Sequence, residues 1–464
     1  MLRLHDTATG LVAPIPERDV GSLGLYVCGP TVYGPPHVGH GRFVLVYDIL
    51  RRYLEHRGRS VRHVSNVTDV DDKIIDRAHA EGRDWREVAL ESEQQWWDAM
   101  DAMGVLRPTV VPHATQFVAE MTDLVAGLVE RKVAYETADG VYLSCGAVDG
   151  YGLLAHQSID SLRAGARVAV AEEKRSPVDF ALWKKAKPGE PTWSSPFGPG
   201  RPGWHTECVV MSLELLGDGF DLHGGGIDLV FPHHENERAQ AVACGRDFAH
   251  HWMHNGLVMV GGEKMSKSLG NYVELADLLG TTDARAYRLL VLRAHYRSPL
   301  EVSNATLADA SAALGRVDEL ARRVESVGTA AGQRAGSRAS PGGAEEPRRL
   351  AVERFEEAMD DDLATPRALA DLLVAIRDSN KLLDGGDVAN GVALARAALE
   401  LLAVLGLEPA SGADRPGEQV VDLASRREVA RRAGDFAAAD ALRAEIVALG
   451  WQVDDAVGGP QLHR

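Results

Sequence analysis

The chain has 464 residues, of which 45% are hydrophobic and 25% charged, and its formal net charge is −17, from 50 basic and 67 acidic side chains. This length predicts two to four domains, and the acidic balance argues against a general nucleic-acid-binding protein. We expect no membrane span, because no run of about 18 apolar residues occurs, and no disulfide scaffold, because there are only four cysteines. The N-terminus lacks the apolar stretch of a secretion signal, so we expect a cytoplasmic protein.

The first elements along the chain predict a nucleotide-binding α/β sheet. Residues 23–29 (LGLYVCG) form a short apolar run ending at a glycine, which predicts a buried strand. Residues 41–58 have helical apolar spacing with a glycine at the end, and residues 60–70 predict a second strand. Strand, loop, helix and strand together make a parallel β-α-β unit. Residues from about 115 to 200 are expected to form an inserted region.

The rest of the chain is expected to be mainly helical. Residues 328–347 are small, polar and glycine-rich, which predicts a disordered linker, and residues 408–418 are similar. The segment between them has helical periodicity, which indicates a helix bundle, and the last fifty residues are expected to form a small appendage. Because few contacts should cross the first linker, we expect the part beyond residue 350 to be removable as a unit.

Residues 231–237 (FPHHENE) place two histidines and two glutamates within seven residues. On a helix only residues three or four apart share a face. His233 with Glu237, or His234 with Glu237, can therefore meet a common target, whereas Glu235 points elsewhere. A metal site or a catalytic pair would use either choice. The alternative is a solvated helix start, with Glu235 near the positive end of the helix dipole.

The loop at residues 28–42 (CGPTVYGPPHVGHGR) lies where the first predicted strand passes into the first helix. In an open α/β sheet this edge is where ligands bind. His37 and His40 flank Gly39, which lets a substrate approach the backbone closely, and amides at the helix start favour phosphate. Alone this H-x-G-H pattern is a weak signal, because two histidines in a loop are often incidental.

Residues 261–271 (GGEKMSKSLGN) carry Lys264 and Lys267 between glycines and serines. Two flexible cations in such a loop suit a polyphosphate whose charge grows in the transition state, and a solvated surface is the alternative for this segment alone. It is not a Walker loop, because G-x-x-x-x-G-K-[ST] is absent. Together, H-x-G-H after a strand and a later K-M-S-K-S resemble the class I aminoacyl-tRNA synthetases, which form aminoacyl-adenylates from ATP.

Two cysteines extend the histidine and glutamate pair into a candidate metal site. Cys28 abuts the first motif, and Cys208 lies in the segment GWHTECVVMS. With His233 and Glu237 they offer two sulfurs, an imidazole and a carboxylate, a set that suits zinc better than magnesium or calcium. The spacing is not that of a compact zinc finger, so the fold must bring the ligands together. His234 is the local competitor of His233.

With these residues the resemblance narrows to the cysteinyl-tRNA synthetase family. The segments that carry it span nearly the whole chain, and they are YVCGPTVYGPPHVGH, NVTDVDDKI, GRPGWHTEC, DLHGGGIDLVFPHHENE, KMSKSLGN and AMDDDLATP. The resemblance implies one zinc ion per chain, bound by Cys28, Cys208, His233 and Glu237. It further implies a cysteine pocket, with Asp228 near the adenosine, and the residues of that pocket are Gly29, Thr68, Trp204 and His223.

The resemblance also implies how ATP is held and which partners take part. His37 and His40, with Gly39 between them, would hold phosphate oxygens, and Lys264 and Lys267 would hold the departing pyrophosphate. The expected partners are ATP with magnesium, L-cysteine and cysteine tRNA, and we expect a monomer. Zinc would select the substrate thiol over the hydroxyl of serine because it prefers soft sulfur, whereas shape alone offers only about 1–3 kcal/mol.

The implied architecture is α/β: a class I Rossmann-like catalytic domain with an inserted connective region, followed by an α-helical bundle and a small C-terminal appendage. The expected parts are the first catalytic half (1–115), the connective insertion (116–200), the second catalytic half with the zinc ligands (201–255), the KMSKS loop with a stem-contact region (256–327), the linker (328–347), the anticodon-side bundle (348–407), and a linker with the anticodon-binding appendage (408–464).

Two other functions would use many of the same residues. A cysteine ligase that acts on an amino sugar, as in mycothiol-type biosynthesis, would share the adenylation core but lack the anticodon-binding end. Residues 350–464 supply such an end here. A non-catalytic paralogue that binds tRNA or zinc would not need His37, His40, Lys264 and Lys267, all of which are present.

Overall fold

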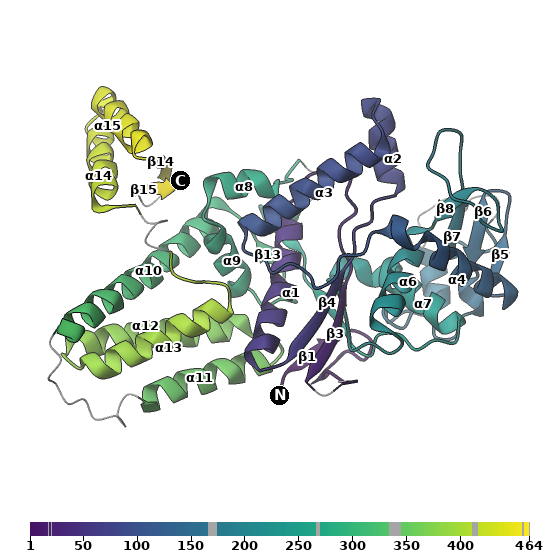
Figure 1. Ribbon diagram of the computed structural model, residues 1–464, viewed down its shortest axis with the longest axis horizontal. Coiled ribbons are helices and arrows are strands. Elements are labelled where there is room, and N and C mark those ends of the chain that lie inside the picture. The colour runs from purple at the N-terminus through teal and green to yellow at the C-terminus, as the bar shows by residue number, and fades with distance from the viewer. Residues whose placement is uncertain are drawn as a thin grey trace.

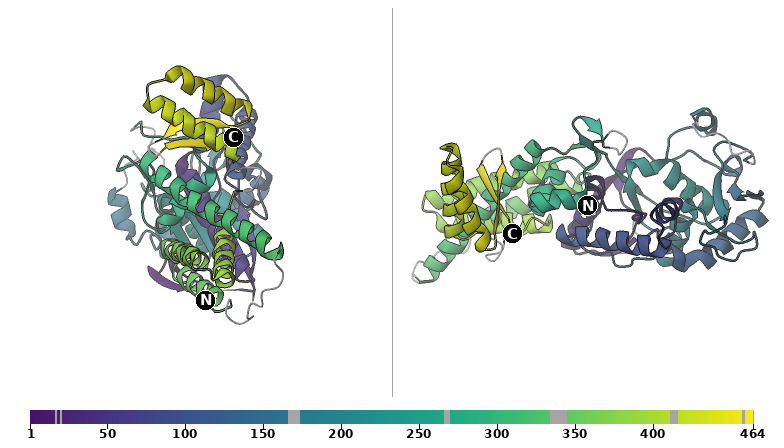
Figure 2. Two further views of the ribbon diagram at one scale, coloured as in Figure 1. Left: turned by 90° about the vertical axis from the view of Figure 1, so that its left-hand side faces the viewer. Right: turned by 90° about the horizontal axis from the view of Figure 1, so that it is seen from above.

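The computed structural model describes residues 1–16, 18–19, 21–165, 174–265, 270–333, 345–410, 416–456 and 459–463. The molecule is elongated (Figures 1 and 2). A central parallel sheet has an antiparallel sheet on one side and a group of long helices on the other, beyond which lies a small C-terminal unit. Within the described ranges, none of the helices combines the length and apolar character that crossing a membrane requires.

The central sheet confirms the predicted parallel β-α-β unit. Its strand order is β10-β9-β3-β4, and all three pairings are parallel. These strands are β3 (Ser22–Val27), β4 (Ser60–Ser65), β9 (Leu222–Gly226) and β10 (Trp252–Asn255). Five of the six residues of β3 are buried. A strand covered on both faces has a continuous apolar run rather than an alternating pattern, which is why this segment was recognisable.

Helix α1 (Val38–His56) connects β3 to β4 and begins at the H-x-G-H motif. The two histidines of the motif close its first turn. The ring of His37 accepts a hydrogen bond from the His40 N–H, and the ring of His40 accepts one from the His37 N–H, both at 3.3 Å. This reciprocal cap fixes both rings at the carboxyl edge of β3. At its other end the helix stops before Gly58, which has φ +76°.

The predicted insertion leaves the central sheet after β4. Helices α2 (Asp72–Glu81), α3 (Trp85–Ala102) and α4 (Val118–Glu130) lead into it. Its four-stranded antiparallel sheet contains β5 (Ala134–Glu136), β6 (Gly140–Leu143), β7 (Phe180–Lys185) and β8 (Gly200–Pro202), with the short helix α5 (Ile159–Gly165) beside them. A separate apolar core, which includes the fully buried Trp183, holds this part together.

The chain then returns to the central sheet and completes the α/β region that we expect to be catalytic, hereafter the catalytic region. Helix α6 (Trp204–Leu216) precedes β9, and a 3-10 turn (Ile227–Leu229) and a π turn (Val230–His234) lead into α7 (Glu235–Ala243). A small sheet of β11 (Val258–Val260), β12 (Glu263–Lys264) and β13 (Leu300–Glu301) flanks the KMSKS segment. Helices α8 (Leu275–Thr281) and α9 (Ala284–Arg293) follow that segment, and β1 (Arg3–Asp6) and β2 (Leu11–Pro14) form a hairpin at the N-terminus.

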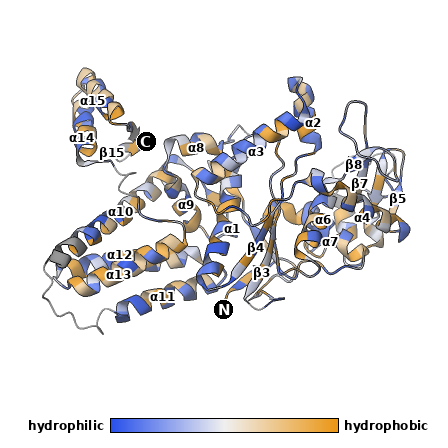
Figure 3. Ribbon diagram, viewed as in Figure 1, coloured by the Kyte–Doolittle hydropathy of each residue, from blue (hydrophilic) through white to orange (hydrophobic). Residues whose placement is uncertain are grey.

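The predicted bundle at 348–407 contains α11 (Glu345–Asp360), α12 (Thr365–Asp384) and α13 (Val388–Val404), and α10 (Asn304–Gln333), from the region before the expected linker, packs against α12 and α13 as its fourth helix. Each carries both hydrophobic and hydrophilic residues along its length (Figure 3), as expected for helices with one buried face. The ends of α10 and α11 enter the segment 328–347, which we expected to be a linker, and residues 334–344 of that segment lie outside the described residues.

The bundle shares its hydrophobic core with the catalytic region, which shows that our expectation of a removable unit beyond residue 350 is wrong. One continuous core extends from Leu25 of β3 through Leu45 of α1 to Phe355 of α11 and Leu401 of α13. The Phe355 ring is fully buried and meets the Tyr53 ring of α1 edge-on, with centroids 6.2 Å apart. The composition of the linker predicted a flexible connection, but it carries no information about whether the helices beyond it pack back onto α1.

The C-terminal unit is built differently, because it has a small core of its own. It consists of α14 (Glu418–Arg432), α15 (Phe436–Ala448) and a hairpin of β14 (Gln452–Ala456) and β15 (Gly459–His463). Leu423, Ile446 and Trp451 are buried in that core. The architecture as a whole is the predicted one: an α/β region with an insertion, then a helix bundle, then a small appendage.

The shared core predicts that Phe355→Ala destabilises the catalytic region as well as the bundle. The substitution removes a buried ring, which costs about 3–5 kcal/mol. In thermal unfolding we expect tryptophan fluorescence, to which seven of the eight tryptophans contribute from residues 85–252, and helical circular dichroism to shift to lower temperature together. Phe436→Ala is the matched control, because that ring is 63% exposed. A shift of the helical signal alone would contradict a shared core.

Candidate functional site

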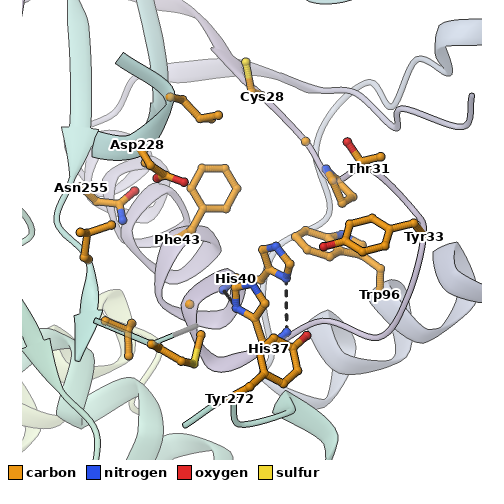
Figure 4. A pocket seen from close by; sticks show the side chains of 18 of the residues that line it. Cys28, Thr31, Tyr33, His37, His40, Phe43, Trp96, Asp228, Asn255 and Tyr272 are labelled. Atoms are coloured by element: carbon orange, nitrogen blue, oxygen red, sulfur yellow. Dashed lines mark hydrogen bonds between the residues drawn. The ribbon is translucent and has the colours of Figure 1, made fainter. Parts of the chain in front are cut away.

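A cleft of about 390 Å³ opens where β3, β9 and β10 end. This volume is in the range of small-molecule sites. Figure 4 shows Cys28 at one end of the cleft and His37 and His40 toward the other. The predicted residues that line it are Cys28, Gly29, His37, Gly39, His40, Trp204, Asp228 and Lys264. Lys267 lies outside the described residues, so its position relative to the cleft stays a prediction.

The His37 and His40 rings are held in a fixed stack. Their centroids lie 3.6 Å apart and their planes differ by 16°. Tyr272 contacts the His37 ring edge-on, and Trp96 contacts the His40 ring in the same way, each with centroids 5.3 Å apart. Lys264 lines the same cleft. Two imidazoles at a helix start and a lysine can together bind an anion such as a phosphate.

Asp228 and Asn255 lie on another wall of the cleft, away from Tyr33 and Trp96 (Figure 4). Asp228 belongs to the 3-10 turn after β9, and Asn255 is the last residue of β10. The carboxyl ends of two neighbouring parallel strands therefore supply polar groups to one side of the cleft. This is the edge at which open α/β sheets bind ligands.

Cys28 leads from the cleft into a buried cluster of metal-binding groups. Its Sγ lies 3.6 Å from the Sγ of Cys208 and 3.4 Å from Oε1 of Glu237. The Nε2 of His233 lies 3.0 Å from the same carboxylate oxygen, so the predicted contact between residues four apart is present. All four side chains are buried, and their donor atoms lie within 4.8 Å of one another. Such a cluster can hold a metal ion.

His234, the predicted competitor, belongs to a second and overlapping group. With Cys28, His223 and Glu237 it also forms a buried set whose donor atoms lie within 4.8 Å. The His234 Nε2 is 3.3 Å from the Cys28 Sγ, and its Nδ1 is 2.7 Å from Nε2 of His254. The Nε2 of His223 is 2.7 Å from Glu237 Oε2. The two sets share Cys28 and Glu237, so a single ion would engage one set or the other.

Burial controls the protonation of these groups. It raises the pKa of the Cys28 thiol well above its usual value, and the adjacent Cys208 and Glu237 raise it further. Burial also lowers the pKa of His233 and of His234 well below the usual value, which keeps both imidazoles neutral. Neutral imidazole is the form that binds metals, and a cation at this point would favour the thiolate.

The cluster and the cleft are joined through Trp204 and its neighbour. The Trp204 ring stacks on His233 with centroids 4.0 Å apart and also lines the cleft. The Nδ1 of His205 lies 2.8 Å from Nδ1 of His233, which leaves Nε2 of His233 directed at Glu237. Sequence analysis missed His205, and its place between Trp204 and Cys208 in the chain is the signal that could have found it.

Gly29, which lines the cleft, and Thr68, which does not, both contact the side chain of Asn66. The Gly29 N–H donates to Oδ1 of Asn66 at 2.8 Å, and a Cβ on Gly29 would lie 1.6 Å from the Asn66 carbonyl oxygen, so only glycine fits. The Thr68 hydroxyl donates to Oε2 of the buried Glu207 at 2.6 Å and is not among the residues that line the cleft. Asn66 also escaped sequence analysis, although it belongs to the segment NVTDVDDKI.

Comparison with known proteins agrees with this arrangement. Residues 14–312 match the family model of the catalytic domain of class I (C) tRNA synthetases, and residues 354–408 match the DALR domain. The chain is 44% identical to the cysteine–tRNA ligase of Clavibacter michiganensis subsp. michiganensis over 481 aligned positions, which cover 99% of this chain and 98% of that protein. The chain belongs to the cysteine–tRNA ligase family of class I tRNA synthetases. It is also 44% identical to a cysteine–tRNA ligase of Thermus thermophilus, with 99% and 98% covered.

Solved structures of more distant synthetases share the fold. A methionyl-tRNA synthetase of Mycobacterium tuberculosis in complex with methionyl-adenylate aligns with a TM-score of 0.63 at 16% identity, covering 83% of this chain and 90% of that one. A LeuRS of Agrobacterium radiobacter K84 aligns with a TM-score of 0.59 at 12% identity, covering 85% and 87%. These likenesses confirm the predicted class I fold.

The buried histidines predict that acid destabilises the metal-free protein steeply. Burial holds the pKa of His205 and of His254 at about 3, below the usual 6.5. The unfolded chain then binds protons that the folded chain excludes, so stability is present above about pH 6.5 and falls as the pH is lowered. Each such histidine should lower the free energy of unfolding by about 2 kcal/mol between pH 7 and pH 5.

Denaturant titrations at the two pH values check this prediction. His254→Gln should show a smaller acid-dependent loss, by about 2 kcal/mol, because one titrating ring is gone. His250→Gln is the control, because that ring is partly exposed beside Asp247. Equal losses in the wild type and both variants would mean that the buried rings do not set the acid sensitivity.

Proposed function

We propose that this chain is a zinc-dependent cysteine–tRNA ligase that activates L-cysteine with ATP and transfers it to the 3′ end of cysteine tRNA. Family membership supports the reaction and its three substrates. The observation that carries the zinc-dependent form is the double role of Cys28, which lines the cleft and belongs to the buried donor cluster. A centre suited to a thiol therefore lies at the end of a cleft suited to a nucleotide.

The distances within the cluster support zinc on Cys28, Cys208, His233 and Glu237. Two sulfurs bound at 2.3 Å to a tetrahedral zinc ion lie about 3.8 Å apart, and a sulfur and a carboxylate oxygen about 3.6 Å apart. The corresponding separations here are 3.6 Å and 3.4 Å. The competing set with His223 and His234 has only one sulfur, and the softer two-sulfur set is the better match to zinc. When bound, zinc supplies a Lewis acid that prefers the thiolate of cysteine to the hydroxyl of serine.

The assigned roles at the ATP end follow from the cleft. In the first step the cysteine carboxylate attacks the α-phosphate and pyrophosphate leaves. We assign His37 and His40, with Gly39 between them, to the phosphate oxygens, supported by their fixed stack at the start of α1. Lys264 and Lys267 are assigned to the charge that builds on pyrophosphate, which magnesium accompanies. In the second step a terminal ribose hydroxyl of tRNA attacks the carbonyl of the adenylate and loses its proton, the ester bond forms, and the bond to AMP breaks so that AMP leaves.

The assigned substrate pocket lies between the cleft and the cluster. Trp204 supports this assignment most directly, because its ring lines the cleft and covers His233. Gly29 and Asp228 also line the cleft, and Asp228 is assigned to the adenosine. The other two residues of the predicted pocket are buried. His223 contacts the carboxylate of Glu237, and Thr68 contacts Glu207. Both are therefore assigned a role in shaping the pocket wall.

The remaining proposals concern the parts of the chain and its surroundings. We assign residues 1–115 and 201–255 to the catalytic domain, 116–200 to the connective insertion, 256–327 to the KMSKS and stem-contact region, and the bundle and appendage (348–407 and 408–464) to the anticodon side of tRNA. The DALR match to residues 354–408 supports the bundle assignment. We expect a cytoplasmic monomer. An amino-sugar ligase is disfavoured, because the alignments cover 98% of the cysteine–tRNA ligases of Clavibacter michiganensis and Thermus thermophilus.

The deciding experiment is cysteine-dependent ATP–pyrophosphate exchange, followed by transfer assays. We expect exchange with cysteine and not with serine, charging of cysteine tRNA, and no transfer to an amino sugar. Transfer to the sugar instead of tRNA would replace this function with the ligase alternative. No exchange with any amino acid would favour a non-catalytic paralogue.

The zinc assignment predicts one tightly bound zinc ion per chain. Cys208→Ser should lose the metal or weaken cysteine binding severely, because a hydroxyl is a poor replacement for a thiolate ligand. Cys145→Ser and Cys244→Ser are matched controls, since neither residue belongs to the buried donor groups. Elemental analysis of the purified proteins is the measurement. Zinc absent from the wild type, or lost in the Cys145 variant and retained in the Cys208 variant, would overturn the assignment.

The assignment of Lys267 predicts a selective effect on rate. Lys267→Ala should slow adenylate formation by about a hundredfold or more while equilibrium cysteine binding stays nearly unchanged, because its charge matters most as pyrophosphate leaves. A single-turnover measurement gives the rate of adenylate formation, and calorimetry gives the equilibrium affinity for cysteine, so the two effects are measured separately. Equal losses of rate and of cysteine affinity would mean that the loop has a structural role.

A further inference from the structure

The turn between α11 and α12, which lies in the segment AMDDDLATP, is clasped by residues from outside the bundle. The carboxylate of Asp362 is buried and accepts hydrogen bonds from the His5 N–H at 2.8 Å and from the Tyr296 hydroxyl at 2.7 Å. Arg297 donates to its other oxygen through Nε at 2.9 Å and through Nη2. The Asp362 N–H donates to the Arg3 carbonyl at 3.0 Å. One aspartate of the bundle thus binds both β1 and the loop after α9.

The backbone of this turn indicates that its shape is imposed by those contacts. Asp362 has φ +55° and Leu363 has φ +49°, so two consecutive residues other than glycine are left-handed. Each such residue costs on the order of 1 kcal/mol and persists only where the surroundings require it. Leu363 is 1% exposed in the shared core. The geometry therefore presents the Asp362 carboxylate to the loop rather than to solvent.

The loop that Asp362 holds, residues 294–299, has its carbonyl groups directed at α1 and at the wall of the cleft. Arg42 of α1, two residues after His40, donates to the carbonyl of Tyr296 at 3.0 Å and to that of Ser298. The Gly256 N–H donates to the Tyr296 carbonyl at 2.8 Å. Gly256 lines the cleft, and a Cβ there would lie 2.6 Å from the carbonyl oxygens of Arg297 and of Ser298.

Arg42 depends on this loop for its hydrogen bonds. Its side chain is 1% exposed, and its guanidinium also donates to the Leu257 carbonyl at 2.6 Å. Within the described ranges no carboxylate pairs with Arg42: its two terminal nitrogens donate only to backbone carbonyls, and its buried Nε has no hydrogen-bond partner. Losing such a partner is costly, because a buried charge left without its hydrogen bonds pays the full desolvation penalty. The position of the loop therefore fixes the position of Arg42 in the first turns of α1.

We propose that Asp362 is a positioning residue for adenylate formation: by clasping residues 295–297 it fixes the carbonyl groups that hold Arg42 and Gly256, and so fixes His37 and His40 against the opposite wall of the cleft. This rests on the proposed function of that cleft. The bundle then belongs to the adenylation machinery as well as to the tRNA side. Asp362 itself does not line the cleft.

The kinetic test compares Asp362→Asn with Asp361→Asn. The Asp362→Asn substitution keeps the size of the side chain and removes the negative charge that faces Arg297. We expect kcat for cysteine-dependent ATP–pyrophosphate exchange to fall about tenfold to a hundredfold, with zinc content and KM for cysteine unchanged, because misplacement far from the chemistry has effects of this size. Asp361→Asn is the control, because that neighbouring carboxylate is 71% exposed. Wild-type kcat in Asp362→Asn, or equal loss of zinc, cysteine binding and rate, would overturn the proposal.

A double-mutant cycle tests the route through Arg42. If Asp362 acts through the loop and Arg42, the effects of Asp362→Asn and Arg42→Lys on kcat should not add, whereas two independent structural defects should add. If Asp362→Asn fails to fold, Tyr296→Phe replaces it, because it removes one hydrogen bond of the clasp and leaves the rest. It should lower kcat in the same direction by a smaller factor, and an unchanged kcat there would overturn the proposal.

Hydrogen exchange makes the test independent of the proposed function. In Asp362→Asn, peptides covering residues 37–46 and 253–260 should exchange faster than in the wild type, and peptides covering 180–185 of the insertion should not change. Unchanged exchange at 37–46 would overturn the positioning role even if the kinetics changed. If the wild type shows no cysteine-dependent exchange of pyrophosphate, the proposed function fails, while faster exchange at 37–46 would still establish the structural clasp.

Discussion

Two thiols and a carboxylate, which repel one another once ionised, are buried together: the Sγ of Cys28 lies 3.6 Å from that of Cys208 and 3.4 Å from Oε1 of Glu237. In the part of the chain that the structure describes, no lysine or arginine pairs with Glu237. Its close partners are His223, His233 and His234, and burial keeps His233 and His234 neutral. Burial of uncompensated acidic groups is costly, and a divalent cation is the species that removes the cost. Much of the structure around the cluster holds these groups together and buries them.

The residues that form and surround the cluster come from distant parts of the chain. Cys28 directly follows strand β3, Cys208 is on α6, and His233 and Glu237 flank the start of α7. Parallel strands place their carboxyl ends at one edge, so β3 and β9 deliver these segments to the same place. Neighbouring rings then orient the ligand groups: His205 and Trp204 fix His233, and His254 fixes His234. The same edge that assembles the cluster opens into the cleft, so the candidate metal site and the cleft share one support.

Sequence patterns anticipated the parts whose geometry is local. The run at 23–29 and the helix after it follow from burial and period, and the contact of His233 with Glu237 follows from helical spacing. The gathering of Cys28 with Cys208 across 180 positions could be inferred only through resemblance to a family. The docking of the bundle was predicted wrongly, since a glycine-rich connection says nothing about the faces it connects. Asp362 escaped notice for a related reason: its partners are a backbone amide and a loop, and neither leaves a periodic signal.

The clasp at Asp362 has a consequence for how the protein forms during translation. The His5 amide and the Asp362 carboxylate that accepts its hydrogen bond are 357 residues apart in the chain. At 5–20 residues per second, the ribosome needs about 20–70 s to synthesise the intervening segment. During that time β1 lies at the edge of an incomplete core, and the loop at residues 294–299, which supports Arg42, lacks its contact with the Asp362 carboxylate. The cleft edge of the sheet can therefore reach its final form only after the bundle has emerged, so a ribosome that stalls before residue 362 would release a chain that has the whole Cys28, Cys208, His233 and Glu237 cluster but whose helix α1 lacks the support of the clasp.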